Sequence, residues 1–203
     1  MYISILNKNE NAESLLEFIR HNGFAILIST VEGKPWASHI PLLLSNDGTK
    51  LSGHIARGNK QWKEWNTESE ILAIFSGPHT YISSSWYDHE NVPTWNYIAV
   101  HVYGKLKILS EEELLQSLKS LTDKYERQSE KPVAVERMNP KYVKSQMLGI
   151  VGFEIEIIKM EGAYKLSQNR DAKNHENIIA ELEKRNDPAS GAIADEMKKA
   201  GHS

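Results

Sequence analysis

The chain has 203 residues, of which 40% are hydrophobic and 25% charged, with a net charge of −3 and no cysteine. The length and composition suit one globular domain, predicted over residues 1–185, followed by a C-terminal tail over 186–203. The absence of cysteine excludes disulfides, thiolate metal ligands and cysteine nucleophiles. The acidic balance disfavours a protein that binds nucleic acid through a general basic excess.

The first half of the chain predicts a helix followed by three short antiparallel strands. The helix covers Asn11–His21, and Gly23 is its expected stop. The strands cover Phe24–Val31, Trp36–Leu44 and Leu51–Ile55, with turn-forming residues between them. Such a meander favours a barrel or sandwich over alternating βαβ units. Gly58–Asn66 then predicts a short helical turn.

The second half predicts further strands and three helices. The strands cover Ile71–Phe75, Thr80–Ser83, Trp95–Ile108 and Ile150–Ile158, the last followed by a turn at Glu161-Gly162. The helices cover Ser110–Gln128, a segment beginning at Asn139-Pro140, and Ala172–Arg185. Ser110 with Glu113 forms a capping-box pattern, and Asn139-Pro140 has the expected cap-then-proline order. We expect the tail to be partly ordered at best, so the predicted class is α+β, mainly antiparallel.

The N-terminus and the hydropathy pattern bear on localisation and partners. The first residues lack the basic start and apolar run of a signal peptide, and no apolar run approaches membrane-spanning length. We therefore expect a cytoplasmic protein with no membrane partner. The helix at Asn139–Gln146 has no second helix that would complete a helix-turn-helix, so the sequence disfavours direct DNA binding.

Residues 79–104 are rich in aromatic side chains and histidines. They include Trp86, Tyr87, Trp95, Tyr97 and Tyr103. Such groups at the start of a long strand could line a flat, partly polar ligand site, or they could form a core or a subunit interface. The eight histidines show no closely spaced pair typical of a zinc or iron site, so no metal is predicted.

The segment Gly53–Trp62 combines cations with small residues at a strand-to-helix turn. Arg57 can bind a phosphate bidentately, Lys60 adds a charge, and Gly58 lets the backbone approach. An ordinary solvated loop would look similar. The spacing is not that of a Walker loop, because Gly-Lys-Ser/Thr is absent.

Three other polar segments are candidate ligand contacts. Pro41 inside a strand indicates an edge, bulge or barrel rim, where unpaired backbone groups could contact a ring edge, and His39 beside it could equally be a hydrogen-bonded strand residue. Trp95 and Asn96 suit a ring edge or a partner subunit. Lys165–Arg170 is dense in donors but also fits a helix entry with Asn169 or Asp171 as cap.

Four short motifs, in order, resemble the FMN-binding PaiB family, whose members are described as negative transcriptional regulators. The motifs are ASHIPLLL (Ala37–Leu44), GHIARGNKQW (Gly53–Trp62), PHTYISSSWY with VPTWNYIAVHVYG (78–104) and KLSQNR (Lys165–Arg170). With the segments between them they span about Phe24 to Arg170. The family is similar to split-barrel flavin reductases and pyridoxamine phosphate oxidases, which bind FMN at a dimer interface. The resemblance therefore implies a homodimeric, FMN-binding split β-barrel with peripheral helices.

The resemblance also implies where FMN binds. Arg57 and Lys60 would bind the phosphate, although PaiB-like sequences often have proline in place of Lys60. Ser38–Leu42 would lie along the flavin ring, and Lys165 and Gln168 would reach it from the second subunit. The full expected cofactor set is Ser38, His39, Pro41, Leu42, His54, Ala56, Arg57, Asn59, Lys60, Gln61, Trp95, Asn96, Lys165 and Gln168.

The sequence leaves three functions open. A flavin-dependent oxidoreductase with an unidentified small-molecule substrate fits the resemblance, and so does a flavin-linked regulator that acts through DNA or a protein partner without turnover. An interaction module with no bound flavin is the third. No residue stands out as an acid or nucleophile, so no catalytic residue is assigned.

Overall fold

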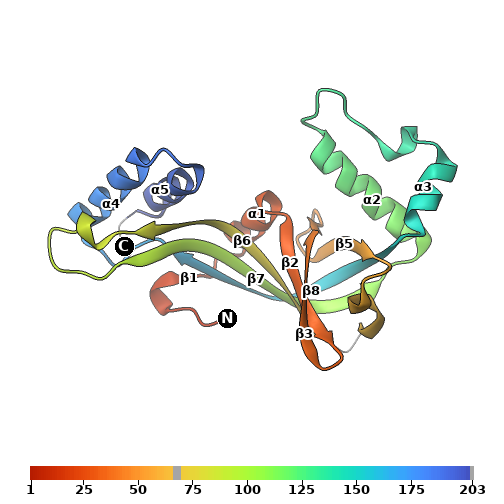
Figure 1. The fold of residues 1–203 in the computed structure, drawn as a ribbon, viewed down its shortest axis with the longest axis horizontal. Helices are drawn as coiled ribbons and strands as arrows, with labels where there is room; N and C mark the ends of the chain where they lie inside the picture. The colour runs from red at the N-terminus through yellow and green to blue at the C-terminus, as the bar shows by residue number, and fades with distance from the viewer. Residues whose placement is uncertain (66–69, 202–203) are drawn as a thin grey trace. The chain divides into compact units, whose positions relative to one another are not determined.

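The computed structural model describes residues 1–65 and 70–201 and shows a mixed α+β fold (Figure 1). The strands are β1 (Lys8–Asn9), β2 (Phe24–Val31), β3 (Lys34–Pro41), β4 (Leu43–Leu44), β5 (Lys50–Ala56), β6 (Glu70–Ile82), β7 (Thr94–Ile108) and β8 (Ile150–Lys165). The α-helices are α1 (Ala12–His21), α2 (Glu111–Glu126), α3 (Pro140–Met147), α4 (Ala172–Lys184) and α5 (Pro188–Ala200). Short 3-10 helices are η1 (Ile5–Asn7), η2 (Lys60–Glu64), η3 (Ser84–Trp86) and η4 (Val135–Arg137).

The strands form one eight-stranded antiparallel sheet, in the order β3-β2-β6-β7-β8-β5-β4 with β1 paired to β8. The predicted α+β class, mainly antiparallel, is therefore confirmed. The chain divides into two compact units. The α4/α5 unit contains residues 1–18, 76–101 and 161–203, and the α2/α3 unit contains residues 19–75 and 102–160. The long strands β6, β7 and β8 contribute residues to both.

The local capping signals of the sequence are confirmed. At the start of α2, Ser110 Oγ accepts a hydrogen bond from the Glu113 N–H at 3.2 Å, and Glu113 Oε2 accepts one from the Ser110 N–H at 2.8 Å. Asn139 caps α3 ahead of Pro140, and Asp171 caps α4. These bonds satisfy backbone donors that a helix start leaves without partners. Each of these helices begins where the sequence predicts.

The predicted meander is only partly correct. Strand β2 pairs with β3, and β4 pairs with β5, as expected. Strand β5 then pairs with β8, with Gly53 opposite Phe153, instead of following β3 in the sheet. Pro41 lies at the end of β3, which is an edge strand, so the expectation for that proline is confirmed.

Two glycines lie inside continuous strands, one where the sequence predicted a gap between strands and one where it predicted a turn. The segments predicted as separate strands at Ile71–Phe75 and Thr80–Ser83 form the single strand β6, which contains Gly77. Likewise β8 continues past Ile158 through the expected turn at Gly162. A Cβ on Gly77 would stand 2.7 Å from the Phe18 ring, and one on Gly162 would stand 2.3 Å from a Leu15 methyl. Both glycines therefore make room for α1.

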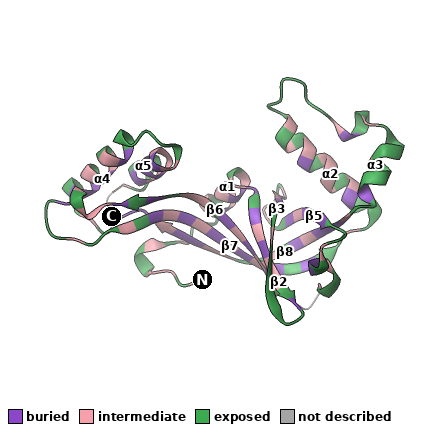
Figure 2. Cartoon of the chain, viewed as in Figure 1, coloured by how far each residue is buried: buried purple, intermediate pink, exposed green. Residues whose placement is uncertain are grey.

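The expectation of a partly ordered tail is wrong for Pro188–Ala200, which form α5. In the α4/α5 unit, α5 buries Ile193, Ala194 and Met197 against α4 and the strands (Figures 1 and 2). The apolar partners are Ile82 on β6, Ile98 on β7, and Ile178 and Leu182 on α4. Burial of this face offsets the weak local periodicity that suggested disorder. The last two residues of the predicted tail lie outside the described residues.

The α2/α3 unit has its own core. Its fully buried side chains include Leu27, Leu42, Leu51, Phe75 and Phe153. Along β7, buried and less buried residues alternate, as Figure 2 shows. Within the described part of the chain, none of the helices combines the length and apolarity that crossing a bilayer would require.

The core position of α5 predicts a loss of stability when its apolar face is cut back. Because Ile193 is fully buried, Ile193→Ala should lower the free energy of unfolding by about 2–5 kcal/mol, measured by urea denaturation. The matched control is Asp195→Ala on the exposed side of the same helix, which should change it by about 0.5 kcal/mol or less. Equal stabilities for the two variants would contradict the docking of α5.

Candidate functional site

The turn between β5 and η2 is the best-defined polar site among the predicted cofactor residues. Strand β5 ends at Ala56, and Asn59 caps η2 by accepting a hydrogen bond from the Gln61 N–H at 2.9 Å. The Asn59 side-chain amide donates to Ser38 Oγ at 2.9 Å. The turn is therefore tied to the neighbouring strand β3, and three predicted residues, Ser38, Asn59 and Gln61, form one network.

Gln61 is fully buried and lacks one hydrogen-bond partner. Its Nε2 donates to the Leu27 and Trp36 carbonyls, at 3.2 and 3.4 Å, and lies 3.1 Å from Ser29 Oγ. The two carbonyls fix the amide orientation, because they can only accept. Within the described residues, Oε1 has no donor. A buried acceptor without a donor costs about 1–3 kcal/mol, so this site is short of one donor, which a ligand or a water could supply.

Arg57 is held firmly on the other side of the turn. Its Nε donates to the Leu148 carbonyl and its Nη2 to the Ile150 carbonyl, both at 2.8 Å. Its backbone N–H donates to the Gly149 carbonyl at 2.8 Å, and its own carbonyl accepts from the Trp62 indole at 2.8 Å. The turn is thereby fixed to the segment that leads into β8.

The Arg57 guanidinium still has donors for an anion. A guanidinium has five N–H groups, and the described bonds use two of them. Arg57 also lines a pocket of about 280 Å³. A second cationic residue, Lys144, and the hydroxyl-bearing Ser110 line the same pocket. Glu111, which lies 3.6 Å from Lys144 as an exposed ion pair, lines it too. Arginine and lysine side chains with free donors have the chemistry that a phosphate group requires.

The other predicted residues of the α2/α3 unit have varied surroundings. Lys60 is exposed and lies 3.7 Å from Glu32, so it and Arg57 have different partners. His39 is exposed and stacks on Phe24, with ring centroids 6.3 Å apart. Unpaired backbone groups were expected beside Pro41. The Leu42 N–H instead donates to the Gly23 carbonyl at 2.8 Å and is not available to a ligand.

His54 lies on β5, and its imidazole can both donate and accept a hydrogen bond. Burial lowers the pKa of its imidazole below the ordinary value of 6.5. The ring is therefore neutral near pH 7, with one nitrogen as donor and the other as acceptor. Among the described residues, no group of three or more histidines, aspartates or glutamates is arranged to hold a metal ion.

Four predicted residues belong to the α4/α5 unit. Asn96 is fully buried, and its Oδ1 accepts from Ser167 Oγ at 3.1 Å. Lys165 Nζ donates to Thr94 Oγ1 at 2.5 Å. Gln168 spans its own turn, accepting from the Leu166 N–H at 2.8 Å and donating to the Tyr164 carbonyl at 2.5 Å. These contacts order the end of β8 ahead of α4.

Trp95, the fourth of these residues, is 54% exposed and belongs to an aromatic cluster on β6 and β7. Its ring centroid lies 6.1 Å from that of His79 and 6.1 Å from that of Tyr81. The cluster is a surface on which another aromatic group could stack.

Sequence reasoning missed the groups that hold Arg57. These are the backbone carbonyls of Leu148 and Ile150, together with the indole of Trp62. Residue type carries no signal for a carbonyl acceptor, because every residue has one. Trp62 stands in the same motif as Arg57 and could have been named from its position.

Solved structures define the class of fold. The FAD and heme binding protein from Mycobacterium smegmatis matches with a TM-score of 0.63 at 16% identity, over 86% of this chain and 80% of that one. The flavocytochrome Anf3 from Azotobacter vinelandii matches with a TM-score of 0.61 at 15% identity, over 77% of this chain and 68% of that one. The fold is the split barrel of flavin-binding proteins, as the resemblance implied.

The family follows from sequence comparison. The family model described as "Putative FMN-binding domain" matches residues 1–159, so the chain belongs to this FMN-binding family. The "Protease synthase and sporulation protein PAI 2" of Bacillus subtilis is 42% identical over 200 residues, covering 98% of this chain and 97% of that protein. An uncharacterized protein of Emericella nidulans is 28% identical, covering 99% and 98%. The PaiB resemblance is confirmed, and the cofactor is FMN.

The geometry of Arg57 predicts a specific loss of phosphate binding. A charged hydrogen bond is worth about 1.5–3 kcal/mol, so Arg57→Ala should weaken FMN binding by about tenfold to a hundredfold in a fluorescence titration. Riboflavin, which lacks the phosphate, should lose much less affinity than FMN does. The matched control is Lys63→Ala, an exposed cation on η2. Equal FMN affinity for the Arg57 variant and the unmodified protein would show that the phosphate lies elsewhere.

Proposed function

We propose that this protein is a homodimeric FMN-dependent redox protein whose cofactor phosphate binds at the turn between β5 and η2. The observation that carries the proposal is the construction of that turn. Arg57 is anchored to two backbone carbonyls and keeps further donors, while Gln61 presents a buried acceptor that lacks a donor within the described residues. A turn prepared in this way loses little conformational freedom when it binds an anionic ligand.

The roles of the chain's own residues follow from their contacts. Arg57 would bind the phosphate, and the Ser38–Asn59 hydrogen bond holds β3 beside the turn, so that Ser38–Leu42 can lie along the flavin. Gln61 would accept a hydrogen bond at Oε1. When bound, FMN supplies the capacity to accept electrons from a reductant and pass them to a substrate.

A homodimer accounts for the predicted residues that lie in the α4/α5 unit. In this proposal, Trp95, Lys165 and Gln168 contribute to the cofactor site from the second subunit, and the buried Asn96 supports them through its hydrogen bond with Ser167. A lysine near the flavin carbonyl edge would stabilise a reduced, anionic flavin. We also propose that residues 1–185 form the single FMN-binding domain predicted from the sequence, and that this domain extends to include α5.

The aromatic cluster supports dimerisation. On β6 and β7, Thr80 and Asn96 are buried, whereas Tyr81 and Trp95 are 39% and 54% exposed. Because successive side chains of a strand point to opposite faces, the aromatic cluster faces away from the buried side. Exposed aromatic groups gathered in one patch are typical of protein interfaces.

A second candidate is a regulator that binds FMN without catalytic turnover. It is favoured by the name of the Bacillus subtilis relative, which refers to protease synthesis and sporulation. The net charge of −3 favours regulation through a protein partner over direct DNA binding.

Anaerobic reduction distinguishes the two candidates. If the protein is a nicotinamide-dependent oxidoreductase, NADH or NADPH should bleach the visible absorption of the bound flavin faster than that of free FMN at the same concentration. The measurement is the absorption spectrum over time, with free FMN as the control. A spectrum unchanged by either donor would count against this oxidoreductase and favour the regulator.

The interface proposal predicts a dimer that depends on the aromatic cluster. Light scattering should give twice the chain mass of 23.1 kDa, and Trp95→Glu should shift the mass toward the monomer at micromolar concentration, because it places a charge in an apolar contact. Tyr142→Glu, an exposed aromatic on α3, should leave the dimer intact. A monomer that still binds FMN would refute the dimer.

A further inference from the structure

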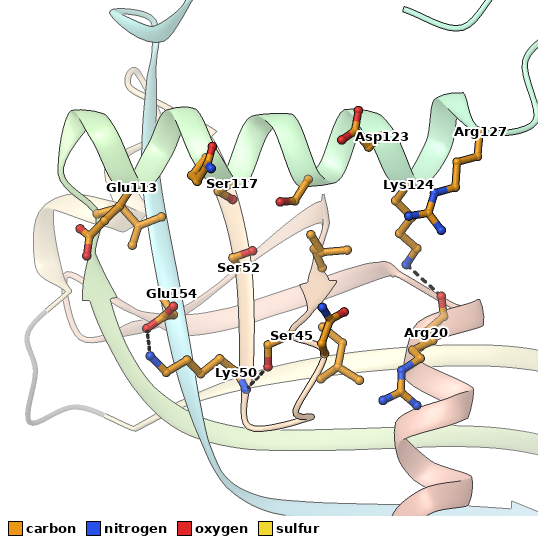
Figure 3. A pocket seen from close by; sticks show the side chains of 16 residues that line it. Arg20, Ser45, Lys50, Ser52, Glu113, Ser117, Asp123, Lys124, Arg127 and Glu154 are labelled. Carbon is orange, nitrogen blue, oxygen red and sulfur yellow. Dashed lines mark hydrogen bonds and ion pairs between the residues drawn. The ribbon is translucent and has the colours of Figure 1, made fainter. Parts of the chain in front are cut away.

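Helix α2 presents a polar face toward the hairpin formed by β4 and β5. Its buried apolar residues are Leu114 and Leu121, seven positions apart on one stripe. The residues of α2 and its C-cap that line one pocket are all polar or charged: Glu113, Gln116, Ser117, Ser120, Asp123, Lys124 and Arg127 (Figure 3). A helix that covers a sheet normally buries apolar residues along its contact. A polar face in this position is more typical of a helix that lines a ligand site.

The pocket is large enough for a small molecule. Its volume is about 670 Å³, within the range of about 300–1,000 Å³ that small-molecule sites occupy. The hairpin and β8 supply the opposite wall, including Ser45, Lys50, Ser52 and Glu154. The pocket shares none of its lining residues with the predicted FMN set.

Two of the acidic residues that line the pocket are already neutralised by lysines. Glu154 forms an ion pair with Lys50 at 2.8 Å, and Glu113 forms one with Lys107 at 2.7 Å. The bond between Glu113 and Lys107 holds the pKa of that carboxyl well below its usual range, at about 2. Each of these two carboxylates is therefore paired with a lysine, and together they contribute little net negative charge to the pocket.

The opposite end of the pocket is positively charged. Figure 3 shows Lys124 and Arg127 at this end, away from the Lys50–Glu154 pair, while the Arg20 guanidinium is directed down along α1. The fourth charged residue at this end, Asp123, has its carboxylate directed away from the hairpin in the same view. Within the residues that the structure describes, no ion pair to Arg127 is seen.

Lys124 is positioned by the end of α1. Its Nζ donates to the Arg20 carbonyl at 2.9 Å, which uses one of its three N–H donors. The side chain is partly buried, and desolvation lowers the pKa of its ammonium. A bound anion would offset that desolvation, because an opposite charge within a few ångströms favours the charged form.

We propose that this pocket binds a small organic dianion, with its anionic group between Lys124 and Arg127 and its polar body against Ser117 and Ser120. A phosphate monoester and a dicarboxylate share the required chemistry, since lysine and arginine bind both groups. The hydroxyls and amide of the α2 face can donate to or accept from a hydroxylated ligand body. The site is separate from that of FMN, and the proposal does not depend on the redox function.

The test uses FMN-saturated protein, so that the cofactor's own phosphate site is filled. Glucose 6-phosphate and malate are titrated separately by calorimetry at constant ionic strength. We expect saturable binding of at least one in the millimolar range or tighter, and the one that binds identifies the anionic group. Absence of saturable binding by both would overturn the proposal.

Variants locate the site. Arg127→Ala should weaken the binding by about tenfold to a hundredfold, from the worth of one charged hydrogen bond. Ser120→Leu, which fills the pocket without changing charge, should also weaken it. Lys131→Ala removes one exposed positive charge just beyond α2 and should have no effect. Unchanged affinity in both pocket variants, or an equal loss in Lys131→Ala, would overturn the proposal.

Discussion

The clamp between Arg57 and the start of β8 is the interaction on which the proposed cofactor site depends. Strand β5 pairs with β8, and Ala56 lies opposite Ile150 at the end of that pairing. Just beyond it, the Arg57 side chain continues the contact by donating to the Leu148 and Ile150 carbonyls. Each bond joins a cation to a neutral acceptor and is worth more than an ordinary hydrogen bond. The turn therefore has a fixed shape before any ligand arrives.

The same turn is fixed from its other side by side chains of β3 and η2. Asn59 serves both as the helix cap and as the donor to Ser38, so one residue sets the start of η2 and its distance from β3. Gln61 continues this network into the interior, where its Oε1 lacks a donor among the described residues. Polar networks with one missing partner are costly in isolation. That cost is consistent with a site completed by a ligand.

Sequence patterns predicted the elements whose signals are local. The capping box at Ser110 and the cap at Asn139 gave the starts of α2 and α3, because these bonds lie within a few residues. The Asp187-Pro188 pair is the same kind of signal, and it marks the start of α5, which the weak apolar periodicity of the tail concealed. The continuity of β6 through Gly77 and of β8 through Gly162 could not be predicted, because the small size of these glycines serves contacts with α1 that are distant in sequence.

The candidate site was predictable in residue type but not in its contacts. The cations and amides of Gly53–Trp62 could be identified from the motif, and the network of Ser38, Asn59 and Gln61 brings two of the motifs together. The separate directions of Arg57 and Lys60 could not be predicted, because they depend on partners at the start of β8 and in the β2–β3 turn, which are distant in sequence. The pocket beneath α2 depends in the same way on the packing of a helix against a distant hairpin.

Binding of FMN at the turn between β5 and η2 can be tested by amide hydrogen exchange with and without the cofactor. Saturating FMN should slow exchange across Ala56–Trp62 and in the neighbouring Ser38–Leu42 segment, while the second half of α2, Leu118–Glu126, should exchange at an unchanged rate. Slower exchange confined to other segments, with Ala56–Trp62 unaffected by bound FMN, would contradict it.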